Sequence, residues 1–430
     1  MSSTTHKRKV FMAGIGGIGM SALAQLMAER GEEVSGVDRE VSPTTELLEQ
    51  KGISVHIGFS EDYLAQDTSI LVYSAAVPSS SPERLRAREL GIPEVSYFEM
   101  LGSVSEQKRT VAVSGTNGKT TTTGMLAKIL KDANASPSAV VGSIVQDFGS
   151  NYLSGTSDIF VVEACEYQRH FLNLSPEVLV ITNIEFDHTD YYQDLADVQD
   201  AFRTLIGKVP AHGYIVTDAE RPSISPLLEG VSATIVDYMK EPEWPLLLPG
   251  EFNQMNARAA AAAARIVMPN ITTGTIITSL SDFHGTWRRF EYKGKTARGA
   301  DVYDDYAHHP TAVRETLSAL RDKVEGKIYV AFHPHLYSRT RDLLDGFSRA
   351  FVAADEILIA PIYAAREVDD GTVSSEILAE RIRAEGGKAQ ALSMEKIEAF
   401  LLQEPGEGDA IMTMGAGDIY KVANAITTKS

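Results

Sequence analysis

The sequence predicts an α/β protein of three domains, and three observations support this prediction. At roughly 150 residues per domain, a chain of 430 residues has room for two or three domains. Short β-rich runs alternate with helical patterns in three successive stretches, which is typical of parallel sheets covered by helices. Two glycine-rich turns each lie between a predicted strand and a predicted helix, where such sheets bind their ligands.

The composition is that of a globular protein with an excess of acidic residues. The chain has 40 basic and 58 acidic residues and a net charge of −18, so its overall field does not favour nucleic acid or anionic lipid. Cys165 is the single cysteine, which excludes an internal disulfide and fits a reducing cytosol. Lys7–Lys9 and the apolar run Val10–Met27 resemble a secretory signal, but the glycines in that run favour a strand, a turn and a helix. We therefore expect a cytoplasmic protein with no membrane span.

The first stretch begins with a strand, a turn and a helix and continues with further strands. Pro82 follows three serines, which is typical of the first position of a helix. The polar segment Gly102–Arg109 is predicted to be a linker. The other predicted elements are a strand at Lys9–Ala13, a helix near Met20–Arg30, and strands at Glu33–Val37 and Ile70–Ser74.

The second stretch follows this linker, and the third begins near Gly294–Ala300. In the second stretch, near-continuous apolar runs at Ile159–Val162 and Val178–Thr182 predict strands that are buried on both faces. A further strand is predicted at Thr110–Val113, with helices at Lys119–Lys131 and the alanine-rich Asn256–Val267. In the third stretch, strands are predicted at Val302–Asp304, Ile328–Phe332, Ile357–Ala360 and Ala410–Met414.

The strongest functional signal is a phosphate-binding loop between the strand Thr110–Val113 and the next helix. Its glycines let the backbone wrap around a phosphate, and the helix N-terminus offers unpaired N–H groups and the positive end of its dipole. The lysine would reach the β- and γ-phosphates of a nucleotide, and the threonine after it would bind Mg²⁺. Only two residues separate the glycines, so this is a variant loop. Its candidate residues are Gly115, Thr116, Asn117, Gly118, Lys119, Thr120 and Thr121.

A second glycine-rich turn, Gly14–Gly19, follows the first strand. It has the spacing G-x-G-x-x-G, and Asp38 stands at the end of the next strand. This pattern is typical of a site where a pyrophosphate rests on a helix N-terminus. By itself it is compatible with NAD, with FAD, with another diphosphate ligand, or with tight packing alone. The candidate residues are Gly16, Gly17, Ile18, Gly19 and Asp38.

Acidic and histidine side chains follow two predicted strands of the second stretch. Glu163 ends the strand Ile159–Val162, and His188 comes shortly after Val178–Thr182. Since α/β sheets place ligands at the carboxyl ends of parallel strands, both side chains are candidate site residues. Mg²⁺ prefers oxygen ligands and phosphates, so Glu163 and the Thr120 hydroxyl are candidate ligands. His188 could complete a second metal site or contact a phosphoryl group, and the alternative is that both side chains cap loops.

Histidines and arginines gather in two segments of the third stretch. Asp304–Pro310 directly follows a strand, and His333–Asp342 comes after the next one. Two histidine pairs could suggest zinc, but no cysteine accompanies them and their spacing is not that of a zinc finger. Arg339 and Arg341 suit a carboxylate or a phosphate as two-pronged donors, or they are exposed loop residues.

In their order along the chain, these motifs resemble those of the Mur ligase family, the ATP-dependent amino-acid ligases of peptidoglycan precursor synthesis. The resemblance spans nearly the whole chain, and Asp304–Pro310 and the first glycine turn are most similar to the branch that adds alanine. Besides the two glycine loops, it rests on Glu163-Ala164, Thr182–His188, Asn253 with Asn256, Gly285–Phe290, Asp304–Pro310, Ser338–Asp342 and Gly415–Ile419.

The resemblance implies a division into three domains. It implies a Rossmann-like UDP-sugar-binding domain at 1–105, a central P-loop ATPase domain with a parallel sheet at 106–292, and a C-terminal Rossmann-like domain at 293–430 that binds the amino acid. The first glycine turn would then hold the diphosphate of a UDP-sugar, with no part for NAD. The domains must close to bring the reactants together, with hinges expected near Gly102–Arg109 and Tyr292–Ala300.

The resemblance also implies a role for each candidate residue. Lys119 would contact the phosphates of ATP, Thr120 and Glu163 would hold Mg²⁺, and His188 would belong to a second metal site. Residues near the nucleotide would be Asn253 and Asn256, together with Arg289 and Asp305 from the hinge and the last domain. Those facing the muramyl carboxylate and the amino acid would be His309, Arg339 and Arg341.

The implied reaction joins L-alanine to the lactyl carboxylate of UDP-N-acetylmuramate, with ATP and Mg²⁺ as cofactors. The γ-phosphoryl group activates the carboxylate as an acyl phosphate, which the amine of alanine attacks. His309 is a candidate base for that amine. We expect a monomer or a weak homodimer that binds neither nucleic acid nor membrane.

Three alternatives remain open at this stage. Within the family, the same UDP-sugar could receive a murein tripeptide. Outside it, the first glycine turn could belong to a nicotinamide-dependent oxidoreductase, or the chain could be a regulatory nucleotide-binding module.

The sequence also departs from the pattern of the family that it resembles at five positions. Asn117 stands where the alanine-adding members usually have histidine, and Ala307 where they usually have glycine. Cys165 and Tyr167 replace an aspartate and a serine that are common in relatives. Arg203 occupies a position where several relatives carry a carbamylated lysine, so we expect no carbamate.

Overall fold

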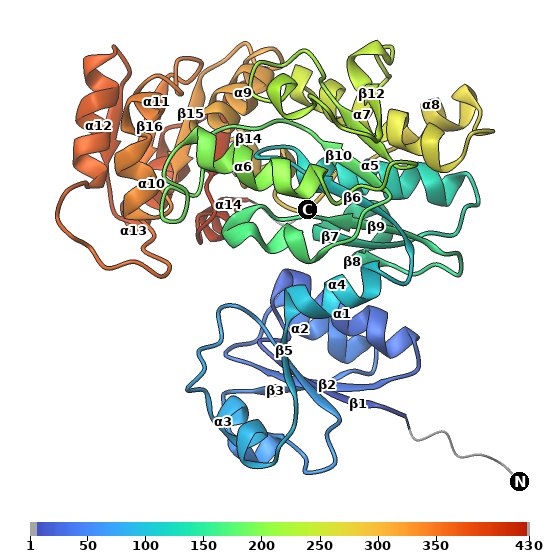
Figure 1. Cartoon of the computed structure of the whole chain (residues 1–430). Helices are drawn as coiled ribbons and strands as arrows, with labels where there is room; N and C mark the ends of the chain where they lie inside the picture. Colours follow the sequence, from blue (N-terminus) through green and yellow to red (C-terminus); the bar gives the residue numbers. More distant parts are fainter. Residues whose placement is uncertain (1–6, 428–430) are drawn as a thin grey trace, which may run out of the picture.

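The chain folds into three α/β domains, each built on its own sheet, and this confirms the predicted fold class (Figure 1). The computed structural model describes residues 7–427. In Figure 1 the first domain, in blue, lies below the other two, which stand side by side. Almost every strand pair is parallel, as apolar strand-length runs between helices predict.

The first domain has a five-stranded, all-parallel sheet in the order β3-β2-β1-β4-β5. β1 is buried on both faces, because Val10 and Met12 pack into one hydrophobic cluster while Phe11 and Ala13 pack into another. The elements are β1 (Lys9–Ala13), α1 (Ile18–Glu29), β2 (Glu33–Asp38), α2 (Pro43–Gln50), β3 (Ser54–Ile57), η1 (Glu61–Tyr63), β4 (Ile70–Tyr73), α3 (Pro82–Glu89), β5 (Glu94–Ser96) and α4 (Tyr97–Ser105).

The central domain has a seven-stranded sheet in the order β12-β11-β10-β6-β9-β7-β8. Only the pair β7–β8 is antiparallel. The elements are β6 (Arg109–Ser114), α5 (Lys119–Asp132), β7 (Ser138–Val145), η2 (Gln146–Phe148), β8 (Ser150–Leu153), β9 (Ile159–Glu163), η3 (Tyr167–Asn173), β10 (Val178–Ile181), α6 (Leu195–Ile206), β11 (Tyr214–Thr217), η4 (Ser225–Leu227), β12 (Thr234–Asp237), η5 (Tyr238–Lys240), α7 (Glu251–Val267) and α8 (Thr273–Ser281).

The third domain has a six-stranded sheet in the order β13-β14-β18-β15-β16-β17, in which only β13–β14 is antiparallel. The predicted strands β15 and β18 are confirmed at both ends. The elements are β13 (Glu291–Lys295), β14 (Asp301–Asp305), α9 (Pro310–Arg321), β15 (Ile328–Phe332), α10 (Tyr337–Asp342), α11 (Leu344–Ser348), β16 (Glu356–Ile359), α12 (Ser375–Ala384), β17 (Ala389–Ala391), α13 (Met394–Gln403), β18 (Ala410–Met414) and α14 (Tyr420–Ile426).

The predicted linker at Gly102–Arg109 is wrong. Gly102 and Ser105 belong to the last turns of α4, and Arg109 already begins β6. A Cβ atom on Gly102 would lie 2.5 Å from the backbone oxygen of Asn173, so α4 packs directly on the central domain. The small, polar residues of this segment serve close packing between two domains, which composition alone cannot distinguish from a loop.

The segment Tyr292–Ala300, expected to act as a hinge, lies within the antiparallel hairpin of β13 and β14. β13 begins at Glu291, two residues before the predicted start of the third domain at 293. The chain passes from the central to the third domain through Gly285–Phe290, just before this hairpin.

The first and central domains share a continuous interface. Helix α1 packs on β7 and β8, and one hydrophobic cluster extends from α1 into the central sheet. Within it, the buried Asn151 side chain donates to the Ser21 hydroxyl over 2.8 Å and to the Ile18 carbonyl over 2.5 Å. Gln25 donates to the Asn151 side-chain oxygen over 3.0 Å. This network links the first turn of α1 to the central domain.

We also find that none of the helices within residues 7–427 combines the length and the apolar character needed to cross a bilayer.

Candidate active site

The phosphate loop lies between β6 and α5 and depends on two glycines. Gly115 and Gly118 have φ angles of +135° and +83°, which L side chains rarely adopt. A Cβ on Gly118 would lie 2.2 Å from the side-chain oxygen of Asn256, and one on Gly115 would lie 2.1 Å from the Thr182 hydroxyl. Larger residues at either position would therefore displace the loop from the groups that support it.

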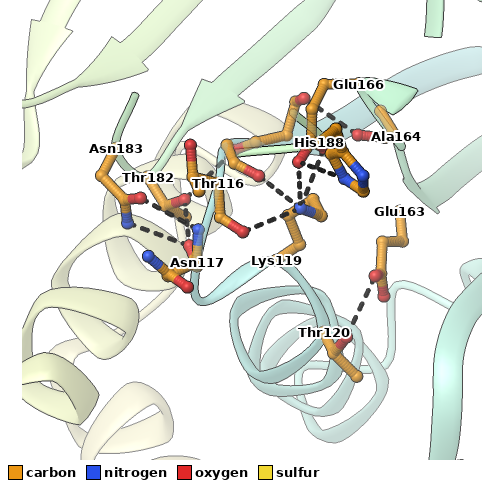
Figure 2. Close-up of polar contacts among 12 residues, drawn as sticks. Thr116, Asn117, Lys119, Thr120, Glu163, Ala164, Glu166, Thr182, Asn183 and His188 are labelled. Carbon is orange, nitrogen blue, oxygen red and sulfur yellow. Dashed lines mark hydrogen bonds and ion pairs between the residues drawn. The ribbon is translucent and has the colours of Figure 1, made fainter. Parts of the chain in front are cut away.

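Lys119 is held inside the loop by three acceptor groups, two backbone carbonyls and one carboxylate (Figure 2). Its ammonium group donates to the carbonyls of Gly115 and Thr116 over 2.5 and 3.0 Å, and to the Glu166 carboxylate over 2.9 Å. Burial opposes the charge on Lys119, but Glu166 and other nearby groups outweigh it, and the pKa of Lys119 is raised. Glu166 therefore holds a charged lysine at the loop.

The other side of the loop is fixed by the residues that follow β10 (Figure 2). The backbone N–H of Asn117 donates to the Asn183 side-chain oxygen over 2.9 Å, and the Thr182 hydroxyl donates to the Asn117 carbonyl over 2.6 Å. The backbone N–H of Thr116 donates to the Asn183 carbonyl over 2.9 Å. The loop is thus anchored on both flanks by groups of the protein itself.

Thr120 and Glu163 form the oxygen pair that the sequence suggested for Mg²⁺. The Thr120 hydroxyl donates to Glu163 over 3.0 Å (Figure 2). The second Glu163 oxygen accepts from the backbone N–H of Gly142 over 2.7 Å. Both are hard oxygen donors beside a phosphate loop, which fits Mg²⁺ with phosphates and waters as its remaining ligands. Across the described residues 7–427, no three His, Cys, Asp or Glu side chains gather as a metal site, so the protein alone would supply few ligands.

His188 lies apart from that oxygen pair. Its Nε2 is 3.5 Å from a Glu166 oxygen, and its ring centre is 4.8 Å from that of Tyr167. Its φ of +52° is left-handed, an unusual backbone state for a histidine. The loop after β10 thus turns this side chain toward Glu166.

A first cavity of about 330 Å³ lies beside the phosphate loop, between the central and third domains. Arg289 reaches it from the interdomain segment, with a terminal nitrogen 3.5 Å from the Thr120 hydroxyl. Asp305 accepts from the backbone N–H groups of Phe290 and Ala307, and burial raises the pKa of its carboxyl group. The predicted residues that line this cavity are Asn117, Gly118, Thr120, Thr121, Asn253, Asn256, Arg289 and Asp305.

A second cavity of about 720 Å³ connects all three domains. It begins at the first glycine turn, passes the phosphate loop, and ends at side chains of the third domain. The predicted residues that line it are Gly17, Ile18, Gly19, Thr116, Asn117, Gly118, Lys119, Thr120, Glu163, His188, Arg289 and Arg339.

At the third-domain end of this cavity, Arg339 forms a buried ion pair across the domain boundary. Its Nε donates to Asp187 over 2.7 Å, and a terminal nitrogen lies 3.0 Å from Nδ1 of His335. Burial and the charge on Arg339 lower the pKa of His335 to about 3 and that of His308 well below its usual range. Both imidazoles are therefore neutral at physiological pH.

Five predicted residues line neither cavity. Gly115 lies at the start of the phosphate loop, against Thr182 and Asn183. Asp38 accepts a hydrogen bond from the backbone N–H of Gly16 over 2.8 Å. His309 caps α9 by accepting from the Thr311 N–H, and its Nε2 lies 3.2 Å from the Phe186 carbonyl. Arg341 is exposed and pairs with Asp342 and Asp370.

Several cavity residues were not among the predicted site residues. Glu166 lies three residues beyond the strand-end Glu163, and His308 and His335 lie in the two histidine-containing segments of the third stretch. Asn183 lies within a motif that carried the resemblance. Nothing in the sequence indicated that Tyr97 or Arg366 lines the cavity, because neither belongs to a recognisable motif. Tyr97 packs so closely that a Cβ on Gly19 would lie 2.7 Å from its hydroxyl oxygen.

The fold and the site define a class of protein: an α/β enzyme of three domains with a phosphate-binding loop at the place where the domains meet. Family comparisons agree with this architecture. Residues 9–109 match the Mur ligase family, catalytic domain, residues 113–243 match the Mur ligase middle domain, and residues 288–417 match the Mur ligase, glutamate ligase domain. The chain belongs to the Mur ligase family.

Individual relatives resemble the chain over its whole length. It is 42% identical to a UDP-N-acetylmuramate–L-alanine ligase of Desulfitobacterium hafniense, covering 97% of this chain and 99% of the relative. It is 37% identical to the enzyme of that name from Clostridium acetobutylicum, covering 98% of each chain. Among solved structures, the UDP-N-acetylmuramate–alanine ligase of Thermotoga maritima superposes with a TM-score of 0.80 at 28% identity, covering 97% of this chain and 98% of that one.

A murein peptide ligase from Psychrobacter arcticus is also similar, with a TM-score of 0.74 at 25% identity, covering 97% of this chain and 98% of that one.

Proposed function

We propose that the protein is an ATP-dependent ligase that joins L-alanine to the lactyl carboxylate of UDP-N-acetylmuramate in peptidoglycan precursor synthesis. The observation that carries this proposal is the cavity of about 720 Å³ that links the glycine turn, the phosphate loop and the third-domain histidines. Its parts at the glycine turn, the phosphate loop and the third domain match the UDP-sugar, the phosphates of ATP and the amino acid of such a reaction. The full-length relatives named UDP-N-acetylmuramate–L-alanine ligase support the same reaction.

The first glycine turn is proposed to bind the diphosphate of the UDP-sugar. Gly17, Ile18 and Gly19 line the cavity at the start of α1, where backbone N–H groups and the helix dipole favour a negative charge. Asp38 would act indirectly, because it accepts a hydrogen bond from the Gly16 N–H and so stabilises the shape of the turn. Membership of the Mur ligase family favours this ligand over NAD.

ATP is proposed to occupy the smaller cavity with its phosphates on Gly115–Thr121. Asn253 and Asn256 would lie beside the nucleotide, and Arg289 and Asp305 would close over it from the third-domain side. Thr120 and Glu163 would hold Mg²⁺, which would neutralise phosphate charge during transfer. His188, next to Glu166, would contribute to a second metal site.

The chemistry follows from what the residues place next to one another. Phosphoryl transfer brings two anions together, and Lys119 and the loop N–H groups offset their repulsion. The resulting acyl phosphate then meets the amine of the amino acid at the third-domain end of the cavity. Arg339 lies there as a carboxylate-binding cation, whereas Arg341 faces solvent.

The amine must lose a proton before it attacks, and His308 fits this need better than His309. His308 lines the cavity, and its Nδ1 lies 2.8 Å from the Tyr306 carbonyl, so Nδ1 carries the ring proton and Nε2 has a lone pair that can accept one. Both ring nitrogens of His309 already lie close to backbone groups, Thr311 N–H and the Phe186 carbonyl. We therefore propose His308 as the proton acceptor and His309 as a helix cap.

We further propose that the protein acts in the cytoplasm as a monomer or a weak homodimer. The net charge of −18 works against binding to nucleic acid or anionic membranes. Gel filtration with light scattering would measure the oligomeric state.

The experiment that tests the proposed function is ADP release with UDP-N-acetylmuramate present. L-alanine, glycine, L-serine and the murein tripeptide are supplied separately, and NADH absorbance is followed in parallel. We expect release that needs both the sugar nucleotide and L-alanine. Release with the tripeptide alone would instead assign the chain to peptide ligation, and no release with any acceptor would overturn the proposal.

A further inference from the structure

Three side chains from two domains meet at one end of the larger cavity. Tyr167 lies in η3 and Asp190 in the loop after β10, both in the central domain, whereas Arg366 lies in the loop after β16 of the third domain. Arg366 donates to one Asp190 oxygen from Nε over 3.0 Å and also from a terminal nitrogen. The Tyr167 hydroxyl donates to the same oxygen over 2.9 Å. Three donors thus converge on one carboxylate oxygen across the domain boundary.

This cluster has one side toward the cavity and one toward solvent. Tyr167 and Arg366 both line the cavity, yet the Arg366 side chain is 47% exposed. The guanidinium carbon of Arg366 lies 4.6 Å from the centre of the Tyr167 ring, within range of a cation–π interaction. The centre of the Tyr167 ring also lies 4.8 Å from that of His188, and about 6 Å from those of His170 and Tyr191. The cluster therefore forms a wall at the mouth of the cavity.

The wall is linked to the buried ion pair deeper in the cavity. Glu367, next to Arg366, accepts from the Ser338 backbone N–H over 3.0 Å and from its hydroxyl over 2.5 Å. Ser338 precedes Arg339, whose guanidinium binds Asp187. The loop after β16 and helix α10 are thus joined, and they contact the central domain on both sides of His188.

We infer that Tyr167, Asp190 and Arg366 form a gate that restricts the acceptor to a single small amino acid. The inference rests on the proposed function. An acceptor must direct its amine toward the acyl phosphate at the phosphate loop, so its carboxyl end points away from that loop, and Tyr167 and Arg366 line the same cavity as Arg339, the proposed carboxylate-binding cation. A single amino acid ends at the wall, whereas a peptide must continue through it.

The gate can select the acceptor while contributing little to the free energy of unfolding. A half-exposed ion pair contributes little to stability because solvent and salt screen it. Opening it would enlarge the acceptor space while the buried pair of Arg339 and Asp187 stays in place. Alanine would then be less enclosed, and a longer acceptor would gain an exit.

Steady-state kinetics of the full-length wild type and of Arg366→Ala test this gate. The acceptors are L-alanine and the tripeptide L-alanyl-γ-D-glutamyl-meso-diaminopimelate, with ATP and UDP-N-acetylmuramate varied in turn. We expect Arg366→Ala to raise the KM for L-alanine about tenfold, the size of effect that one lost pocket contact produces. The kcat/KM for the tripeptide should rise by a similar factor relative to the wild type. The KM values for ATP and UDP-N-acetylmuramate should change less than about twofold.

Two controls separate the gate from a general structural effect. Arg349→Ala removes an exposed arginine that pairs with Glu385 within the third domain, and it should leave the acceptor profile unchanged. The exchange Asp190→Arg with Arg366→Asp reverses the ion pair and should restore selection of L-alanine over the tripeptide. A purely structural role would instead raise the KM of all three substrates together.

Each remaining outcome has a defined meaning. An Arg366→Ala enzyme with the acceptor profile of the wild type overturns the gate, and so does an equal loss for all three substrates. A wild type that uses the tripeptide as well as L-alanine overturns the gate and leaves ligase activity in place. A wild type that ligates no acceptor overturns the proposed function, and the gate with it.

Discussion

At the scale of single residues, charges buried around the phosphate loop compensate one another. Glu166 is almost fully buried, and burial alone would raise its pKa, yet the charge on Lys119 and contacts with His188 lower it. The lysine is thus held where phosphates would bind, at the cost of desolvating two charges. A bound nucleotide would compete with Glu166 for the same ammonium group.

Replacement of Lys119 separates its chemical role from its structural one. We expect Lys119→Ala to lower kcat by a factor of at least about 10²–10³, the usual effect of losing one donor to a transition-state anion. It should also lower the melting temperature, because Glu166 loses its partner. The double variant Lys119→Ala with Glu166→Gln should regain stability but remain inactive in ADP release. Near-normal turnover in either variant would refute the assignment of the ATP site.

The buried pair Asp187–Arg339 predicts how stability depends on pH. Burial would raise the pKa of Asp187, but the charge on Arg339 outweighs it and lowers that pKa well below its usual range. The folded carboxylate thus stays charged at pH values where the same group in the unfolded chain, with a pKa of about 3.9, takes up a proton. The stabilisation is complete above that unfolded pKa and is lost as the pH falls through the folded one.

We therefore expect Asp187→Asn to be less stable than the wild type at pH 7 by about 3–5 kcal/mol, as for other broken buried pairs. The difference should shrink as the pH falls below about 4. Urea unfolding between pH 7 and pH 3 measures it. Asp345→Asn, which removes an exposed carboxylate, should match the wild type at every pH. A deficit in Asp187→Asn that does not vary with pH would contradict this account.

At the scale of elements, the sequence predicts strands and helices, which depend on local sequence pattern. It does not predict which side chains reach the cavity, because that depends on tertiary packing. Apolar runs locate strands such as β15 because a strand buried on both faces needs few polar residues. Arg339 and Arg341 illustrate the limit. They lie two positions apart on α10, so they point to nearly opposite sides, and only the packing of α10 decides that Arg339 faces the cavity. Arg366 could not be found at all, because its partner Asp190 is remote in sequence.

Helix α4 offers a test of packing at this scale. In Gly102→Ala the new methyl group would lie 2.5 Å from the Asn173 carbonyl oxygen, so backbone must shift and we expect a loss of about 1–3 kcal/mol. The matched control is Gly274→Ala in α8, where the nearest atom is 3.7 Å away. That change should be neutral or should stabilise by about 0.5–1 kcal/mol. Chemical denaturation of both variants gives the comparison, and equal stabilities would contradict close packing of α4.

At the scale of the whole molecule, the two domain boundaries differ in character. The first and central domains share a hydrophobic cluster and the buried amides of Gln25 and Asn151. The central and third domains are joined at the cavity by ion pairs instead, those of Asp187 and Asp190. We therefore expect the first two domains to move as one unit, and closure of the third domain to assemble the site.

Asn151→Asp tests whether the first two domains act as one unit. The carboxylate cannot donate to the Ile18 carbonyl or the Ser21 hydroxyl, and it places a charge in the interface at a cost of at least about 1–3 kcal/mol. Because Ile18 belongs to the first glycine turn, affinity for UDP-N-acetylmuramate should fall while ATP binding persists.

Titration calorimetry with each nucleotide and differential scanning calorimetry measure these effects. The variant should unfold in two resolved transitions, because the first domain separates from the central one. Asn424→Asp, an exposed amide on α14, should behave as the wild type does. A variant that keeps a single transition and full affinity for UDP-N-acetylmuramate would show that the apolar part of the interface alone fixes the glycine turn. The buried amides would then have no part in joining the two substrate sites.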